Sequence, residues 1–234
     1  MGDSLIIFDF KTKTMIKINF QSVSLWNSIL VVSVIFTAFV LPVLPEEWQK
    51  TVFKMAYSVI YISALFSLNK RSKIILVIFF ATLILEWFSS LFNLGWLLII
   101  SKSTNTLFFL IIVFSLIMQI AKSSEVTAVA ILGSIAGYLL LGLIYSIFIS
   151  VIIKNDPGAY SNMPVDLQQG DHNTASFSLY YSFVTIASLG YGDICPLKPY
   201  TRSLATFIAV SGQFYIAIIV ALLVGKFSAK GGAK

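Results

Sequence analysis

The fold of this chain is decided by one stretch in its last third, Thr185-Ile186-Ala187-Ser188-Leu189-Gly190-Tyr191-Gly192-Asp193. It closes an uncharged segment that begins at Thr174, and this segment is too short and too broken by glycine at its end to be a full membrane crossing. Irregular backbone at membrane depth is tolerated only where it is buried in protein or lines a wet cavity. The stretch therefore predicts a re-entrant half-helix, at about residues 176–187, followed by an irregular strand.

The composition around this stretch is that of a membrane protein. Hydrophobic residues make up 58% of the 234 residues, charged residues 11%, and the mean hydropathy is +0.90. Soluble domains are about 45–50% apolar and about 25% charged, so a soluble enzyme is excluded. The single cysteine, Cys195, and the single histidine, His172, exclude a disulfide framework and a zinc site built from Cys and His. No enzyme activity and no cofactor are expected.

Six windows of low charge predict an all-α integral membrane fold with six transmembrane helices, the re-entrant helix and its loop. The windows are residues 23–45, 55–69, 74–100, 103–121, 126–153 and 203–225. Glu86 interrupts the third window, and Asn93 and Gly95 also allow a helix end near Phe92. We expect an N-terminal cytoplasmic segment (1–22), a four-span peripheral domain (23–122), a two-span domain that holds the re-entrant helix (123–227) and a short cytoplasmic tail (228–234). The alternation of apolar residues within residues 6–20 suits a strand or a surface-lying segment.

The basic residues lie in the connectors between the windows, so they indicate topology and not a nucleic-acid partner. Six crossings place both termini on one side. That side holds ten cations, and the other side holds six: Lys11, Lys13, Lys17, Lys70, Arg71, Lys73, Lys122, Lys226, Lys230 and Lys234, against Lys50, Lys54, Lys102, Lys154, Lys198 and Arg202. Because cytoplasmic loops carry the excess of Lys and Arg, we expect a multi-pass plasma-membrane protein in contact with lipid, with both termini cytoplasmic.

The two glycines of the opening stretch have a physical use. Gly190 and Gly192 can adopt positive φ without a Cβ penalty, which lets alternate peptides turn their carbonyl groups toward one axis. Rings of carbonyl oxygens can replace the water shell of a dehydrated K⁺. The C-terminal end of the preceding half-helix carries a partial negative charge that favours a cation.

These residues resemble the selectivity filter of tetrameric potassium channels, and the resemblance covers about the last 110 residues. The filter's usual Thr-Val-Gly-Tyr-Gly falls on Ser188, Leu189, Gly190, Tyr191 and Gly192. The resemblance implies that K⁺, as the permeant ion, binds the Ser188 hydroxyl and the carbonyls of Leu189, Gly190 and Tyr191. Since one chain offers one filter loop, it also implies a homotetramer. Serine in place of threonine keeps the oxygen and loses the β-branched stiffness, so a weakly selective monovalent cation channel is the alternative.

Four further residues are expected to support the filter. Tyr180 and Tyr181 occupy positions where related channels carry an aromatic cuff, so their hydroxyls are expected to brace Tyr191 and Asp193, with simple core filling as the alternative. Thr185 and Asp193 belong to the same supporting set. At Val184, some members of the family carry a carboxylate that would pair with Asp193, and this chain lacks it.

The last apolar window resembles the inner helix of the same family. Gly212 lies twenty residues after Gly192, where the family has its hinge, and close packing of a small residue is the rival use. Ile216 and Val220 follow at four-residue spacing and are candidates for an apolar constriction of the pore.

Six windows with the filter between the fifth and sixth resemble the voltage-gated layout, but the fourth window lacks the charges of a voltage sensor. Such a sensor needs several Arg or Lys at three-residue spacing, and residues 107–121 contain none. A cytoplasmic ligand-binding domain is not expected. Glu86 is predicted either to contact another span, or to be proton-sensitive, or to sit at a wet boundary, and His172 is a candidate external pH sensor. A non-conducting regulatory subunit is a further alternative.

Overall fold

The computed structural model describes residues 4–9, 14–68, 73–92, 95–123, 126–163 and 174–231. Within these ranges the chain is mainly helical. The main helices are α1 (Phe20–Ile35), α2 (Glu46–Ser67), α3 (Lys73–Phe92), α4 (Gly95–Lys122), α5 (Ala128–Asn155), α7 (Thr174–Ile186) and α8 (Pro199–Gly231). After α1 the helix continues as a π-helical turn, η1 (Phe36–Val40), and a 3₁₀ turn, η2 (Leu41–Val43), and a second 3₁₀ turn, η3 (Pro157–Ala159), follows α5.

The N-terminal segment forms the exception to the predicted all-α fold. Strands β1 (Ser4–Asp9) and β2 (Thr14–Asn19) pair as an antiparallel hairpin, with Ser4 opposite Asn19 and Asp9 opposite Thr14. The alternating apolar pattern allows a strand here, and the strand is confirmed.

Several described helices are suited to a membrane by length and composition. Four stretches of the described chain qualify as full spans, namely Ser24–Val43, Ile100–Lys122, Ala128–Asn155 and Pro199–Ser228, and Thr51–Ser67 and Ile75–Phe88 are shorter apolar helices. A single third span over residues 74–100 is wrong, because α3 ends at Phe92 and α4 begins at Gly95. The end near Phe92 is the alternative that the helix-breaking residues Asn93 and Gly95 offer. Consequently α4 begins eight residues before the predicted window at 103.

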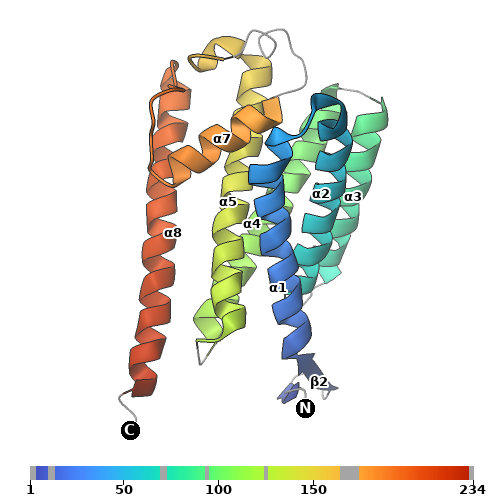
Figure 1. Cartoon of the computed structure of the whole chain (residues 1–234). Coiled ribbons are helices and arrows are strands. Elements are labelled where there is room, and N and C mark those ends of the chain that lie inside the picture. The colour runs from blue at the N-terminus through green and yellow to red at the C-terminus, as the bar shows by residue number, and fades with distance from the viewer. Residues whose placement is uncertain are drawn as a thin grey trace.

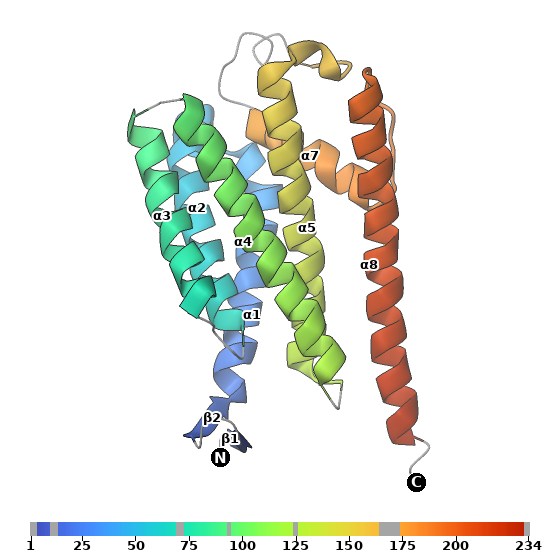
Figure 2. The ribbon, with the colours of Figure 1, turned by 180° about the vertical axis from the view of Figure 1, so that it is seen from behind.

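The helices form a bundle in which α5 lies between two groups. It packs against α1 and α4 on one side and against α7 and α8 on the other. The short α7 lies aslant between α5 and α8, in the half of the bundle away from the termini, and the two ends of the chain lie at the same end of the bundle (Figure 1). Figure 2 shows the same order from behind, with α3 farthest from α8.

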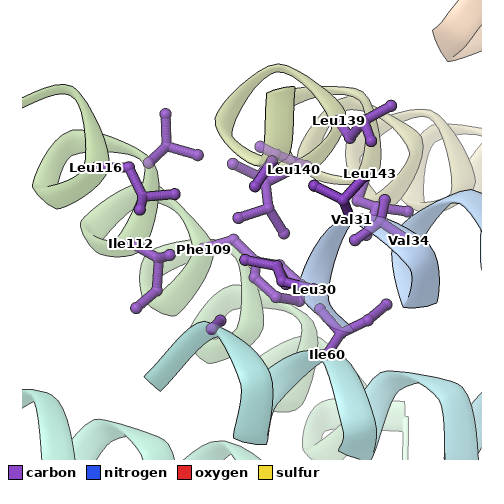
Figure 3. Close-up of a cluster of buried hydrophobic side chains, with 14 of the residues drawn as sticks. Leu30, Val31, Val34, Ile60, Phe109, Ile112, Leu116, Leu139, Leu140 and Leu143 are labelled. Carbon is purple, nitrogen blue, oxygen red and sulfur yellow. The ribbon is translucent and has the colours of Figure 1, made fainter. Parts of the chain in front are cut away.

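Helices α1, α2, α4 and α5 share an apolar core. Figure 3 shows side chains from α1, α2, α4 and α5 pointing toward one another. Nearly all of them are fully buried: Leu30, Val31, Val34, Ile60, Phe109, Ile112, Leu116, Leu139, Leu140 and Leu143. Because α5 supplies part of this core, the peripheral helices and the helices around the predicted filter share one packed unit.

Three sets of polar contacts join helices of this unit. The buried Asn27 of α1 donates from Nδ2 to the Val129 carbonyl of α5 (3.1 Å) and accepts a hydrogen bond from the Ser67 hydroxyl of α2. Such interhelical hydrogen bonds contribute about 0.6 kcal/mol each in a membrane, with a maximum of about 1.7 kcal/mol. Asn27 therefore joins α1, α2 and α5 at one point.

Glu86 makes the contact to another span that is one of its predicted roles. Its Oε2 accepts hydrogen bonds from Asn105 Nδ2 at 2.7 Å and from Ser101 Oγ at 3.2 Å, both on α4. An intramembrane carboxylate is costly unless polar groups solvate it, and these two donors serve that purpose. Whether Glu86 is also proton-sensitive stays a prediction.

The third tie joins α8 to the end of α4. The Lys226 ammonium donates to the carbonyls of Ile120, Ala121 (3.1 Å) and Ser123 (2.6 Å). These are carbonyls at the C-terminal end of α4, where the helix dipole favours a cation. The end of α8 far from the filter is thereby fastened to the peripheral helices of the same chain.

Candidate functional site

The predicted re-entrant helix is α7, which begins two residues earlier and ends one residue earlier than expected. Its 13 residues give a length of about 20 Å at 1.5 Å per residue, too short for a hydrocarbon core of about 30 Å. The chain reverses directly after Ile186, and the carbonyls at the end of α7 remain satisfied. Ala187 N donates to Phe183 O (3.1 Å), Ser188 N to Thr185 O (2.9 Å) and Leu189 N to Val184 O (3.0 Å).

The backbone after this reversal alternates in conformation. φ is positive at Ser188 (56°), Gly190 (56°) and Gly192 (80°), and it is not positive at Leu189 or Tyr191. Alternate left-handed residues turn successive peptide carbonyls to one side, which an ordinary strand does not do. The two glycines are expected in this conformation. Positive φ is not expected at Ser188, because it is uncommon for a residue that carries a side chain. In the structure, Ser188 directly follows the reversal, and its N–H donates to the Thr185 carbonyl at the end of α7.

Two side chains of this strand are largely exposed in a single chain. Leu189 is 57% exposed and Tyr191 67% exposed in a single chain. A cavity of about 390 Å³ lies between α7, the strand and α8, and its lining includes Val184, Tyr191, Asp193 and Ala209. The missing carboxylate at Val184 therefore leaves an apolar wall beside the strand.

Of the two tyrosines that are predicted to brace the filter, one contacts Asp193. The Tyr180 hydroxyl donates to Asp193 Oδ2 at 2.5 Å, and this bond lowers the pKa of the Asp193 carboxyl below its ordinary value. Tyr181 instead lies buried in the core beside Tyr160, with ring centroids 4.9 Å apart, which matches the alternative of core filling. The Thr185 hydroxyl donates to Tyr181 O (2.7 Å), so Thr185 contributes to the strand through its backbone carbonyl.

Replacing Tyr180 by phenylalanine is expected to shift the acid stability of the protein. A lowered folded-state pKa stabilises the fold above the ordinary pKa of Asp, and this contribution is lost as the pH falls through the lowered value. Without the tyrosine hydroxyl the pKa of Asp193 rises, so acid unfolding should begin at higher pH. Thermal unfolding of the detergent-solubilised protein between pH 7 and pH 3 measures this shift. Tyr181→Phe is the matched control, and equal midpoints for the two variants would refute the brace.

The outer end of the strand is also held by a segment that sequence reasoning missed. Residues 159–162, just after α5, run beside residues 193–197. The contacts are Asn162 Nδ2 to Asp193 O (2.6 Å), Ser161 N to Cys195 O (2.9 Å), Cys195 N to Ser161 Oγ (2.8 Å) and Leu197 N to Ala159 O (2.9 Å). Asp193 is thus held through its side chain by α7 and through its carbonyl by this segment. No local pattern in the loop sequence signals the pairing.

On α8, Gly212 lies in a close contact with the end of α7. A Cβ built at Gly212 would lie 2.3 Å from the Ile186 carbonyl oxygen, so the close-packing use of this glycine is present in the structure. Its use as a hinge stays a prediction. Ile216 and Val220 are 42% and 52% exposed in a single chain. They lie outside the core of their own chain, and their place in a pore also stays a prediction.

A metal site made of acidic, cysteine or histidine side chains is not found among the described residues, since no group of three or more such residues gathers there. Near the strand, the described chain offers oxygens of the backbone, of the Ser188 hydroxyl and of the Asp193 carboxylate as cation ligands. His172, the candidate pH sensor, lies outside the described residues.

Comparison with known proteins agrees with this geometry. Residues 136–229 match a family described as ion channel, which is not an enzyme family. Potassium voltage-gated channel subfamily A member 10 of Mus musculus, Homo sapiens and Gallus gallus is 29% identical over 86 residues. That alignment covers 37% of this chain and 16% of each relative, so this chain matches about a sixth of their length. No solved structure matches the chain.

The matched residues begin within α5 and run through α7, the alternating strand and nearly all of α8. They therefore contain each part that surrounds the strand. The chain thus combines apolar helices that are suited to a membrane by length and composition with a segment that is similar to an ion channel family and to part of a potassium channel.

Proposed function

We propose that this chain forms a homotetrameric, K⁺-selective channel that conducts passively across the plasma membrane. The observation that carries the proposal is the alternating backbone from Ser188 to Gly192, placed after a re-entrant helix. In this proposal the permeant K⁺ binds the hydroxyl of Ser188 and the carbonyls of Leu189, Gly190 and Tyr191, and Gly192 completes the filter. Carbonyl oxygens arranged in rings replace the water shell of the ion.

Four copies are needed because one chain supplies one strand of a ring. The exposure of α8 supports assembly, since only 22% of its most apolar window is buried in a single chain, compared with 61% for α5. Lipid and neighbouring copies would cover the remainder. The six-span topology, the division at residue 122 into peripheral and pore domains, and the cytoplasmic position of both termini belong to the same proposal.

The peripheral helices are not proposed as a voltage sensor of the usual kind. The cations of α4 are Lys102 and Lys122, twenty residues apart, whereas a sensor helix carries a repeated series. Lys102 Nζ donates to Ser150 Oγ of α5 at 2.7 Å, so this charge is held against α5 of its own chain.

The test is a reversal potential measured with purified protein in a planar bilayer under opposed K⁺ and Na⁺ gradients, together with the mass of the protein in detergent. We expect a tetramer and a reversal near the K⁺ equilibrium potential, with little dependence of the current on voltage. Reversal near zero would favour the weakly selective cation channel. The observation that favours this alternative is that Ser188 and Leu189 stand where the filter usually has threonine and valine. A tetramer without current would favour a non-conducting regulatory subunit.

A further inference from the structure

A side chain of α8 contacts the innermost residue of the strand. Gln213 Nε2 donates a hydrogen bond to Ser188 Oγ at 3.0 Å. The two residues are 25 positions apart in the sequence. This contact involves the one side-chain oxygen that the proposed function places among the K⁺ ligands.

The backbone conformation of Ser188 is already fixed, so rotation of its hydroxyl about χ1 is the conformational freedom that remains. Ser188 N donates to Thr185 O at 2.9 Å, Leu189 N is bonded to Val184 O, and φ of Ser188 is 56°. Serine lacks the second branch that restricts χ1 in threonine, so nothing intrinsic selects one rotamer. The nearby Thr185 hydroxyl donates to the Tyr181 carbonyl and is therefore engaged elsewhere.

Gln213 is itself carried by a well-anchored turn of helix. On one side, the Ser211 hydroxyl is hydrogen-bonded to the Tyr145 hydroxyl of α5 at 2.6 Å. On the other, the Tyr215 hydroxyl donates to Ser134 O of α5 at 2.7 Å. Between them, Gly212 lies in close contact with the end of α7. Packing and hydrogen bonds of this kind hold a site residue within about 0.5 Å of its working position.

We propose that Gln213 is a positioning residue that sets the selectivity of the filter by orienting the Ser188 hydroxyl. A hydroxyl has two acceptor lone pairs and one proton. The amide of Gln213 occupies one lone pair, which leaves the other for the cation and directs the proton away from it. The glutamine thus supplies the rotamer restriction that threonine would carry in its own side chain. This inference rests on the proposed function of Ser188 as a K⁺ ligand.

The test is Gln213→Met, which keeps the length of the side chain and removes the donor, made in three backgrounds: Ser188, Ser188→Thr and Ser188→Ala. The first measurement is the K⁺/Na⁺ permeability ratio from reversal potentials. The second is the difference in thermal unfolding temperature of the protein between K⁺ and Na⁺ solutions, which reports ion binding without conduction. The unchanged chain is measured beside each variant.

In the Ser188 background we expect the permeability ratio to fall about five-fold or more and the unfolding temperatures in K⁺ and Na⁺ to converge. In the Ser188→Thr and Ser188→Ala backgrounds the same substitution should change the ratio less than two-fold, because the rotamer is fixed intrinsically in one and the hydroxyl is absent in the other. Equal losses in all three backgrounds, or no loss with Ser188, would overturn the inference. If the unchanged chain were not K⁺-selective, the proposed function would fail on its own measurement.

Discussion

Replacing Gly212 by alanine is expected to displace α8 from the end of α7 and to abolish K⁺ current. The new Cβ would lie 2.3 Å from the Ile186 carbonyl oxygen and 2.6 Å from Ile186 Cγ1. Overpacking of this kind costs about 1–3 kcal/mol per site, and here part of the obstacle is backbone that is bonded into the reversal after α7. Four copies in a tetramer would repeat the cost. The measurements are the fraction of tetramer in detergent, its unfolding temperature, and K⁺ flux into liposomes.

Gly225→Ala is the matched control on the same helix. No atom lies within 4 Å of a Cβ built at Gly225, so the substitution should leave assembly intact and gain the helix preference of alanine, about 0.5–1 kcal/mol. The pair of variants also separates the two uses of Gly212. A hinge would give Gly212→Ala a normal tetramer fraction and unfolding temperature with altered opening, and that outcome would contradict the packing role.

Replacing Gly190 by alanine is expected to lower the K⁺/Na⁺ permeability ratio at least ten-fold while the tetramer still assembles. Here space is not the obstacle, because no atom of a single chain lies within 4 Å of the position that the new methyl group would occupy; the obstacle is the φ of +56°. An L-residue in this conformation costs about 1–2 kcal/mol, and the four filter strands of the proposed tetramer would each carry this cost. The strand is expected to relax by turning a carbonyl away from the ion path. Reversal potentials and K⁺ flux measure the loss.

The same Gly225→Ala variant controls for a general effect of removing glycine from the region of α8 and the filter. A permeability ratio for Gly190→Ala within two-fold of the unchanged chain would refute the need for positive φ at this position. A loss of assembly as severe as that expected for Gly212→Ala would mean that Gly190 acts through packing between copies and not through the direction of its carbonyl.

The contrast between these two glycines shows which parts of the site the sequence can predict. The pattern Gly-Tyr-Gly predicts positive φ because glycine is the residue that adopts it without cost. For Gly212 the sequence allows two uses, and only the position of the Ile186 carbonyl establishes that a side chain has no room there. Likewise, the sequence predicts that the two adjacent tyrosines act alike, whereas the helix rotation directs Tyr180 to Asp193 and Tyr181 into the core.

The boundaries of the elements follow the same division. The re-entrant helix is predicted within two residues at each end, since an uncharged run and a reversal signal are local properties. The predicted end of the third span at residue 100 is wrong, because apolar composition continues across the break between α3 and α4. Hydropathy predicts which segments are apolar enough for lipid, but it does not predict where one helix ends within a continuous apolar run.

The sequence by itself therefore determined the apolar, membrane-suited composition, the short helix before the reversal, the two glycines at positive φ and the absence of a repeated charge series over residues 107–121. The tertiary structure decided the contacts that hold the site: Gln213 to Ser188, Asn162 to Asp193 and Lys226 to the end of α4. Their members are 25, 31 and 103 residues apart. Hydropathy and backbone preference act over a few neighbouring residues, whereas a hydrogen bond between distant segments exists only once packing has brought its donor and acceptor within about 3 Å.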